Sequence, residues 1–501
     1  MNNIVIINAS GITEYALKEI GNRRNSIEYA VEAALKMPIS AQAAIIDEES
    51  PSQDYLSGFK LKKLETPTAS GLIKTLIELS EGWDNIFYFY ADCPLTDTAL
   101  AGKMYENHLK YFSEYTFADG YPDGISVEIL KPSILPLLAR IAETNDVSSG
   151  RDTVFSLIEK DINSFDIETE ISPDDQRLLR LSFYPDTRRN YIQLKALMAL
   201  LPEQNRFESK LGFSGEVLKT VRSKAEVLRT LPVFFEIETT GTHPQNISYI
   251  PEAASPEGSL TPGKFKEILA KISDYSGDAV ISLSVRNEPS VHPAVAELAA
   301  AVLDYPDFRL LIETSGTFWP QEQLDRILNL DAERLTWIID LDALDRELYQ
   351  GLRGSGRDEA YKFASMMVGK SPDNVWLQAV RMKDNEADME QFYKYWKERT
   401  NNVIIQKYDW CCGRLDQKKV TDLSPVKRLP CWHLKREMII LLDGTVPLCR
   451  DDLDRTMVLG NIFSDDMETV WQNGKQYYRQ HLIEEYPDLC RNCDEYYTYN
   501  Y

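Results

Sequence analysis

Short apolar runs separated by amphipathic stretches recur along the first two hundred residues. The runs at Ile4–Ile7, Ala43–Ile46 and Asn85–Tyr90 have the length and apolar character of strands that are buried on both faces. Between the first two runs, Ser26–Lys36 carries apolar residues at helical spacing behind a serine N-cap signal. This alternation predicts an α/β domain with a largely parallel sheet.

A second α/β series begins near residue 233. A helical pattern at Thr261–Tyr275 separates the first two strand candidates, and further helical intervals follow. Repeated β–α units of this number predict a full or partial (β/α) barrel, in which sites lie at the C-terminal ends of the strands. The strand candidates of this series are Val233–Glu238, Ala279–Val285, Phe308–Glu313, Leu335–Asp340 and Val375–Val380.

Length and charge narrow the class of protein. A chain of 501 residues suggests about three domains, and 43% hydrophobic with 27% charged residues is typical of globular proteins. The formal net charge of −23 repels phosphate backbones and anionic lipid surfaces, so we expect no nucleic-acid partner. The expected partner is an unidentified protein or small molecule.

The chain start and the apolar runs indicate a cytoplasmic protein. The first residues read as a buried strand rather than a secretory signal, and no apolar run approaches the ~18–20 residues of a membrane span. Membrane insertion is therefore not expected. Seven cysteines in so long a chain are too few for a disulfide framework.

Four of the cysteines have the spacing of a metal site near the C-terminus. Cys431 and Cys449 flank an apolar segment, and Cys490 and Cys493 form a C-x2-C pair. Four thiolates hold either an iron–sulfur cluster or a structural zinc, because both prefer soft sulfur ligands. We expect a strand at Met438–Leu442, followed by a two-residue hairpin turn that returns the chain to Cys449.

Two further cysteines, Cys411 and Cys412, are adjacent in the chain. Adjacent cysteines are poorly placed to chelate one metal together, so we interpret them as packing residues at a strand end. A redox role or a role as an extra ligand is the alternative.

Part of the N-terminal region resembles a known enzyme family. Ala91-Asp92-Cys93-Pro94-Leu95 follows a strand, and the segment from Asp119 to Glu128 follows later. Together they resemble the cytidylyltransferases of surface-polysaccharide biosynthesis, which have the nucleotide-diphospho-sugar transferase fold. The resemblance implies that Asp92 helps to bind the magnesium ion of a nucleotide, which makes a magnesium–nucleotide complex a candidate ligand.

The same region departs from that family where its chemistry is concentrated. The loop Asn8–Glu14 lacks the arginine and lysine that cradle a triphosphate in the family. Tyr184 stands where the second metal-binding aspartate is expected, and Asp186 is the nearby substitute. We therefore expect a retained fold with a lost or altered active site.

Motifs at the expected strand ends carry a second resemblance. They are Glu238-Thr239-Thr240-Gly241, Glu288-Pro289, Glu313-Thr314-Ser315-Gly316-Thr317 and Ile339-Asp340-Leu341-Asp342-Ala343. With these motifs, residues 233–501 resemble radical SAM enzymes with a SPASM extension. In that family the Glu-Pro region helps to hold the amino group of S-adenosylmethionine, which implies a cofactor-binding role for Glu288 and its neighbour Asn287.

The first loop of the barrel departs from the radical SAM pattern. The family has C-x3-C-x2-C there, whereas this chain has Thr242, Asn246 and Tyr249. A hydroxyl, an amide and a phenol do not replace thiolates on an iron–sulfur cluster. The Gly-Gly pair of the family is also replaced, by Arg286-Asn287. We expect that reductive cleavage of S-adenosylmethionine is lost, and the cofactor itself is doubtful as a ligand.

The C-terminal region resembles the shortened form of the SPASM domain. Gly444 and Cys449 have the Gly-x4-Cys spacing of these domains, and Cys490-Arg491-Asn492-Cys493 completes the motif. The resemblance implies one [4Fe–4S] cluster on Cys431, Cys449, Cys490 and Cys493, with zinc as the alternative. The combination is similar to spirochaete SPASM fusion proteins that also lack the radical SAM cysteines.

These observations divide the chain into four predicted regions. Residues 1–200 form a cytidylyltransferase-like domain, 201–231 a helical linker, 232–425 a radical-SAM-like barrel, and 426–501 a SPASM domain. The predicted function is an iron–sulfur protein with a degenerate barrel that binds a partner or substrate, or stores electrons. A CTP-dependent sugar nucleotidyltransferase and a SPASM oxidoreductase with an unorthodox cofactor site are the alternatives. No catalytic residue is assigned.

Overall fold

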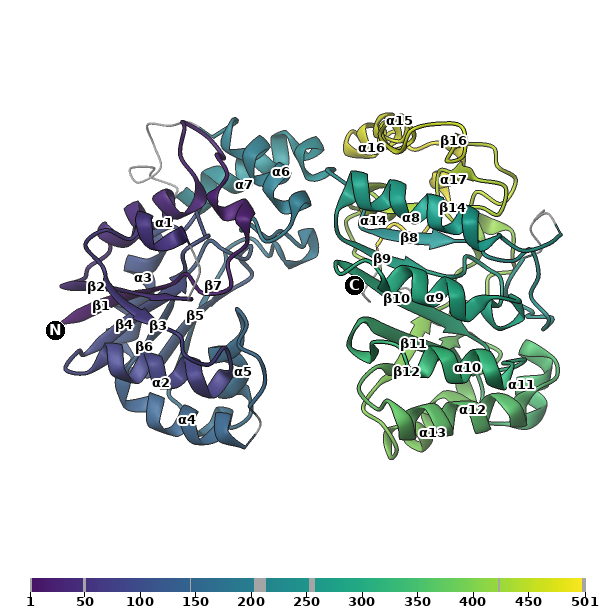
Figure 1. Ribbon diagram of the computed structural model, residues 1–501, viewed down its shortest axis with the longest axis horizontal. Helices are drawn as coiled ribbons and strands as arrows, with labels where there is room; N and C mark the ends of the chain where they lie inside the picture. Colours follow the sequence, from purple (N-terminus) through teal and green to yellow (C-terminus); the bar gives the residue numbers. More distant parts are fainter. Residues whose placement is uncertain are drawn as a thin grey trace. The chain divides into compact units, whose positions relative to one another are not determined.

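The computed structural model describes residues 2–47, 51–144, 146–201, 213–251, 257–421 and 424–497, and the chain forms two compact units, Met1–Leu228 and Arg229–Tyr501 (Figure 1). Each unit contains a seven-stranded, mainly or wholly parallel sheet with helices packed beside it. The predicted α/β class is therefore confirmed.

The N-terminal unit has a sheet in the order β3-β2-β1-β4-β6-β5-β7. All its pairs are parallel except those of β6, which runs antiparallel to β4 and β5. Every residue of β1 is buried, as expected for a central strand covered on both faces. The strands are β1 Asn3–Asn8, β2 Ala41–Ile46, β3 Lys60–Lys63, β4 Asn85–Tyr90, β5 Tyr115–Asp119, β6 Glu128–Leu130 and β7 Ile167–Ile171.

Helices cover both faces of this sheet and form two apolar cores. One core includes side chains of α1, α3, α6 and α7, and the other includes side chains of α2, α4 and α5. The helices are α1 Ser26–Leu35, α2 Ala69–Ser80, α3 Thr98–Lys110, α4 Leu135–Glu143, α5 Thr153–Glu159, α6 Arg188–Met198 and α7 Phe213–Ser223.

Two expectations for the helices of this unit are refined. The N-cap of α1 is Asn25 rather than Ser26, because Asn25 and Glu28 form a reciprocal capping box. The segment 201–231, expected as a helical linker, is described only in part. Within it, α7 buries Phe213, Val217 and Val221 in the N-terminal core.

The C-terminal unit has an all-parallel sheet in the order β13-β12-β11-β10-β9-β8-β14. From β8 to β13 neighbouring strands follow chain order, as in a (β/α) barrel, and β14 is added beside β8. The strands are β8 Phe234–Ile237, β9 Ala279–Ser282, β10 Phe308–Thr314, β11 Leu335–Asp340, β12 Val375–Arg381, β13 Val403–Lys407 and β14 Glu437–Ile440.

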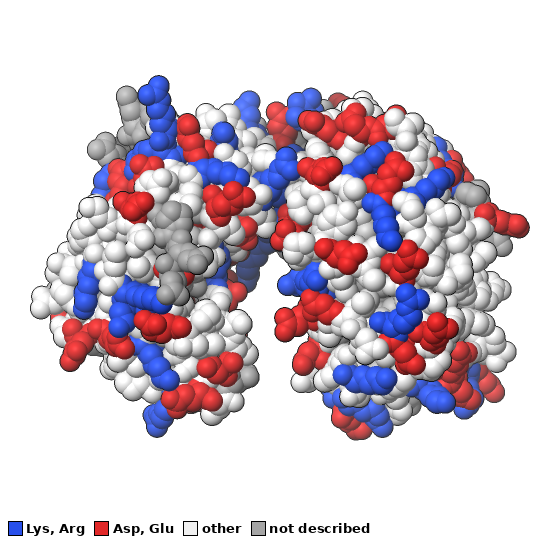
Figure 2. All heavy atoms as spheres, viewed as in Figure 1, with Lys and Arg blue, Asp and Glu red and all other residues white. Residues whose placement is uncertain are grey.

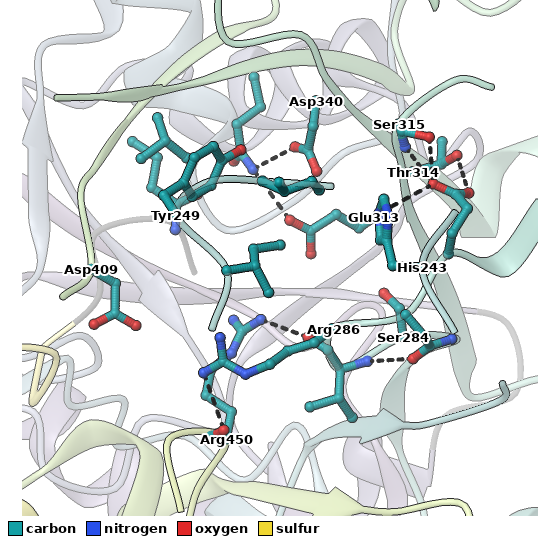
Figure 3. Close-up of a pocket in the computed structure, with 18 of the residues that line it drawn as sticks. His243, Tyr249, Ser284, Arg286, Glu313, Thr314, Ser315, Asp340, Asp409 and Arg450 are labelled. Atoms are coloured by element: carbon teal, nitrogen blue, oxygen red, sulfur yellow. Dashed lines mark hydrogen bonds and ion pairs between the residues drawn. The ribbon is translucent and has the colours of Figure 1, made fainter. Parts of the chain in front are cut away.

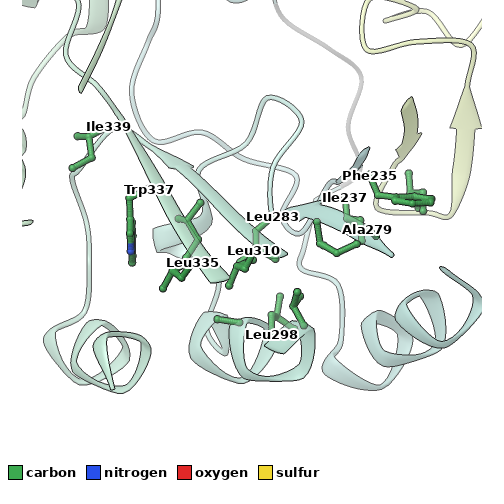
Figure 4. Close-up of a cluster of buried hydrophobic side chains, with 14 of the residues drawn as sticks. Phe235, Ile237, Ala279, Leu283, Leu298, Leu310, Leu335, Trp337 and Ile339 are labelled. Atoms are coloured by element: carbon green, nitrogen blue, oxygen red, sulfur yellow. The ribbon is translucent and has the colours of Figure 1, made fainter. Parts of the chain in front are cut away.

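Helices that connect these strands pack on the outer face of the sheet. Leu310, Leu335 and Trp337 extend from the strands toward the helices, and Leu298 of α9 lies among the residues of the same core (Figure 4). The helices are α8 Pro262–Ser276, α9 Val295–Leu303, α10 Gln321–Leu328, α11 Arg346–Arg353, α12 Arg357–Lys370 and α13 Glu386–Lys397.

The C-terminal segment corrects the hairpin prediction. Asp443-Gly444 does form a tight turn, in which Leu441 N donates to Thr445 O at 2.9 Å. However, β14 pairs with β8, and the strand after the turn, β15 (Thr445–Pro447), pairs antiparallel with β16 (Val458–Asn461). The reason is burial, because three of the four β14 residues are fully covered and complete the parallel sheet.

Four short helices complete this segment: α14 Trp432–Arg436, α15 Met467–Asn473, α16 Lys475–Leu482 and α17 Asp488–Arg491. On the face drawn in Figure 2, basic and acidic side chains are interspersed over each unit. Among the described residues, no helix has both the length and the apolar character needed to span a bilayer.

Candidate functional site

The four predicted metal ligands lie together in the C-terminal unit. Cys431, Cys449, Cys490 and Cys493 all line one enclosed cavity, which we call the cysteine cavity. Cys431 precedes α14, Cys449 follows β15, and α17 carries Cys490. Backbone hydrogen bonds hold the pair at the end of the chain, because Cys493 N donates to Cys490 O at 3.3 Å.

The chemistry of this donor set fits a metal centre. Burial raises the pKa of Cys490 to about 12, and it also raises the pKa values of Cys431 and Cys449. Buried thiols of this kind ionise when a metal cation supplies compensating positive charge. Four cysteines that line one pocket therefore match an iron–sulfur cluster or a zinc ion.

The cysteine cavity has an open volume of about 20 Å³. Its donor chemistry fits either an iron–sulfur cluster or a single zinc ion.

Two groups that sequence reasoning did not assign to this site also line the cysteine cavity. They are Cys412 and His481. The sulfur atoms of Cys412 and Cys493 and a carboxylate oxygen of Asp451 lie within 4.8 Å of one another. The pKa of Cys493 is lowered, because Cys412 donates a hydrogen bond to its sulfur.

Cys411 lines a different pocket from its chain neighbour Cys412. Its sulfur accepts a hydrogen bond from Arg286 Nη1 at 3.7 Å and lines a pocket at the mouth of the barrel. The two adjacent cysteines therefore do not converge on one metal. Each contributes to a separate cavity.

The barrel-mouth pocket has a volume of about 120 Å³ and lies at the C-terminal ends of the strands (Figure 3). Glu313 on β10 and Asp340 on β11 face this pocket and share one hydrogen-bond donor. Gln378 Nε2 donates to Glu313 Oε1 at 3.2 Å and to Asp340 Oδ1 at 2.9 Å. The pKa of Asp340 is raised, first by burial and then by the charge of Glu313.

The first barrel loop is held by a buried ion pair. Tyr249, at the position of the third cluster cysteine of the radical SAM pattern, donates its hydroxyl hydrogen to Asp342 Oδ2 at 2.5 Å. Arg353 Nη1 contacts the same carboxylate oxygen at 2.5 Å and donates to Tyr249 at 2.8 Å. Because Asp342 and Arg353 are both fully buried, this contact fixes the loop against the barrel.

The two predicted cofactor-binding residues of the barrel are engaged by the protein itself. Glu288 is fully buried, and its carboxylate accepts hydrogen bonds from Thr314 Oγ1 at 2.6 Å and from Ser315 N at 2.7 Å. Asn287 Nδ2 donates to Thr239 Oγ1 at 3.1 Å. Both residues line the barrel-mouth pocket.

Arg286 connects this pocket to the loop that carries Cys449. Its Nη2 donates to Asp451 Oδ1 at 2.6 Å and to the carbonyl oxygen of Arg450 at 3.2 Å. The side chain that replaces a glycine of the family pattern thus ties a barrel loop to the edge of the cysteine cavity.

The third predicted site residue, Asp92, belongs to the N-terminal unit. It is fully buried directly after β4, and both its carboxylate oxygens contact Arg151, at 2.9 Å and 2.5 Å. The Arg151 guanidinium also lies over the ring of Tyr184, 3.8 Å from the centroid. Asp186, the proposed substitute ligand, accepts a hydrogen bond from Asn190 at 2.7 Å.

Comparisons with known proteins identify one domain and one relative of this chain. Residues 431–494 match the SPASM family, described as an iron–sulfur cluster-binding domain. An uncharacterized protein of Treponema pallidum (strain Nichols) is 38% identical over 366 residues, which cover 70% of this chain and 98% of the relative.

Several solved structures show partial similarity to this chain. Streptococcus suis SuiB bound to the precursor peptide SuiA is 14% identical with a TM-score of 0.43, covering 64% of this chain and 78% of SuiB. A cytidylyltransferase from Leptospira borgpetersenii is 16% identical with a TM-score of 0.37, covering 45% of this chain and 96% of the enzyme. This chain carries a SPASM domain at residues 431–494 and belongs to the same protein family as the uncharacterized Treponema pallidum protein.

Proposed function

We propose that this chain is an iron–sulfur protein that holds one [4Fe–4S] cluster on Cys431, Cys449, Cys490 and Cys493. On this proposal its radical SAM-like barrel does not cleave S-adenosylmethionine. The protein acts in the cytoplasm by binding a partner or substrate, or by storing electrons. A bound cluster supplies one-electron storage at a potential set by its surroundings.

The observation that carries the proposal is the contrast between two places in the C-terminal unit. The cysteine cavity gathers four thiols, whereas Tyr249 in the first barrel loop is tied to Asp342 and Arg353. A phenol in a buried ion-pair network is not available as a ligand to iron. On this proposal the cysteine cavity supplies the ligands for one cluster, whereas the first barrel loop supplies none.

The chain's own residues shield the proposed cluster site. Arg428 Nη2 donates to the Cys490 carbonyl at 2.7 Å, and Glu495 N donates to the Cys493 sulfur at 3.3 Å. Leu434, Leu448 and Leu489 also line the cavity. Apolar cover and hydrogen bonds to ligand residues are the protein's means of setting a cluster potential.

The contacts of Asp92 and Glu288 speak against the two alternative functions. Arg151 contacts both Asp92 oxygens and supplies the compensating positive charge that a magnesium ion would otherwise provide. Glu288 accepts hydrogen bonds at both oxygens from Thr314 and Ser315, so its carboxylate is already satisfied without a cofactor amine.

A turnover assay tests the inactive barrel directly. Anaerobically reconstituted protein is incubated with S-adenosylmethionine and a strong reductant, and 5′-deoxyadenosine is quantified by mass spectrometry. We expect no release above a protein-free control. Release in proportion to protein concentration, retained in Cys490→Ala, would mean that the barrel holds a second cluster and would overturn the proposal.

A further inference from the structure

His481 on α16 is a buried polar side chain in the cysteine cavity. Its relative exposure is only 3%, and it lines the cavity together with Cys431, Cys449, Cys490 and Cys493. Neither of its ring nitrogens has a hydrogen-bond partner among the residues that the structure describes. Buried polar groups are nearly always paired, so both nitrogens point to a missing interaction.

The neighbours of His481 explain why the protein does not supply that interaction. Arg428 lines the same cavity, but a guanidinium only donates, and its Nη2 is used by the Cys490 carbonyl. The Tyr486 ring contacts the imidazole edge-to-face at 4.9 Å between centroids. The other neighbours in the cavity include Leu434 and Leu489, which have no polar side-chain atoms.

A neutral imidazole carries one N–H donor. The acceptors that line the cavity are the cysteine sulfur atoms and the carboxylates of Asp451 and Glu495. Asp451 is paired with Arg286 and Glu495 with Lys407, so the sulfur atoms are the acceptors that suit His481.

We propose that His481 donates its N–H to a sulfur of the cluster site, either a cysteine thiolate or an inorganic sulfide, and thereby raises the reduction potential. The inference rests on the proposed function, because it requires a cluster on the four cysteines. A hydrogen bond to sulfur stabilises the more negative, reduced state more than the oxidised state. His481 is thus a positioning and potential-setting residue rather than a ligand.

The test compares three variants of the full-length, anaerobically purified protein. His481→Leu removes the donor, His481→Gln keeps an N–H, and Gln476→Leu makes a similar change at an exposed position of α16. Iron and sulfide content, the midpoint potential from an EPR-monitored titration, and exchangeable-proton couplings in H2O and D2O are measured for each.

We expect His481→Leu to keep its iron and sulfide while its midpoint potential becomes more negative and one exchangeable-proton coupling disappears. Gln476→Leu should match the wild type, and His481→Gln should retain the coupling. The glutamine variant keeps the test decisive if the leucine variant does not fold.

An unchanged potential and coupling in His481→Leu would overturn this inference alone. Loss of iron from both His481 variants would also overturn the inference, because it would identify His481 as a ligand of the cluster. Zinc without sulfide in the wild type would overturn it together with the proposed function.

Discussion

At the scale of single residues, Asp92 and Arg151 form a two-point ion pair in the N-terminal unit. The carboxylate is fully buried, and the guanidinium contacts both of its oxygens. In cytidylyltransferases the matching aspartate helps to hold magnesium, as the sequence resemblance implies. In this chain the Arg151 guanidinium lies beside the carboxylate and compensates its buried charge.

Removing Arg151 should therefore destabilise the N-terminal unit. Arg151→Gln leaves a buried carboxylate uncompensated, and we expect the free energy of unfolding to fall by about 3 kcal/mol. Arg177→Gln is the matched control, because Arg177 forms an exposed pair with Asp175 and contributes little. Urea denaturation followed by circular dichroism measures both variants. Equal stability of the two would contradict the importance of the buried pair.

At the scale of elements, the turn between β14 and β15 positions Cys449. Gly444 has a φ of +83°, and a Cβ at this position would lie 2.3 Å from Phe463 Cδ2 and 2.7 Å from Asn461 Oδ1. Its carbonyl also accepts a hydrogen bond from Ile462 N at 2.8 Å. Only glycine suits this combination of left-handed backbone and close approach.

Gly444→Ala should consequently weaken both the turn and metal retention. We expect a loss of at least about 1 kcal/mol in unfolding free energy, with a lower iron content after purification because Cys449 follows the turn. Gly263→Ala is the control, since a Cβ on Gly263 meets no atom within 4 Å. Iron retention in Gly444→Ala equal to that in the control would show that the turn does not position the ligand.

A buried histidine on α3, His108, makes the stability of the fold depend on pH. His108 is fully buried between Thr116 Oγ1 at 2.8 Å and Asn85 Oδ1 at 3.2 Å, and burial lowers its pKa from 6.5 to about 4. The unfolded chain therefore binds more protons between these two pH values, and stability contributed by His108 is lost as the pH falls from 6.5 to 4.

The matching measurement is the pH dependence of unfolding in wild-type protein and His108→Gln. The glutamine keeps hydrogen-bonding groups but does not titrate, so its stability curve should be flatter between pH 4 and 6.5. The two proteins should differ least at pH 4, where the advantage of the neutral histidine is smallest. Parallel curves through this window would rule out His108 as the group responsible.

Much of the element pattern follows from local sequence, whereas strand partners and long-range contacts do not. Apolar runs such as Ile4–Ile7 predict buried strands because such runs need cover on both faces. The same rule does not name a partner, which is why the hairpin after β14 was predicted wrongly. The four-cysteine spacing indicated the metal site, but His481 and Arg151 carry no local signal and approach their partners only through the fold.

At the scale of the C-terminal unit, the barrel and the SPASM segment are joined by specific contacts. β14 extends the barrel sheet, and Arg286 bonds to Asp451, two residues after Cys449. The cysteine cavity and the barrel-mouth pocket therefore share Arg450 as a lining residue. A ligand in the barrel mouth would lie against the loop that carries Cys449.

The most direct test of the account is the iron, zinc and acid-labile sulfide content of anaerobically purified protein, measured for the wild type, Cys490→Ala and Cys93→Ala. Cys93 is a buried free cysteine of the N-terminal unit, so it is the matched control. The account predicts about four irons and four sulfides per chain in the wild type and in Cys93→Ala, and the loss of both in Cys490→Ala. One zinc without sulfide, or iron that survives Cys490→Ala, would contradict it.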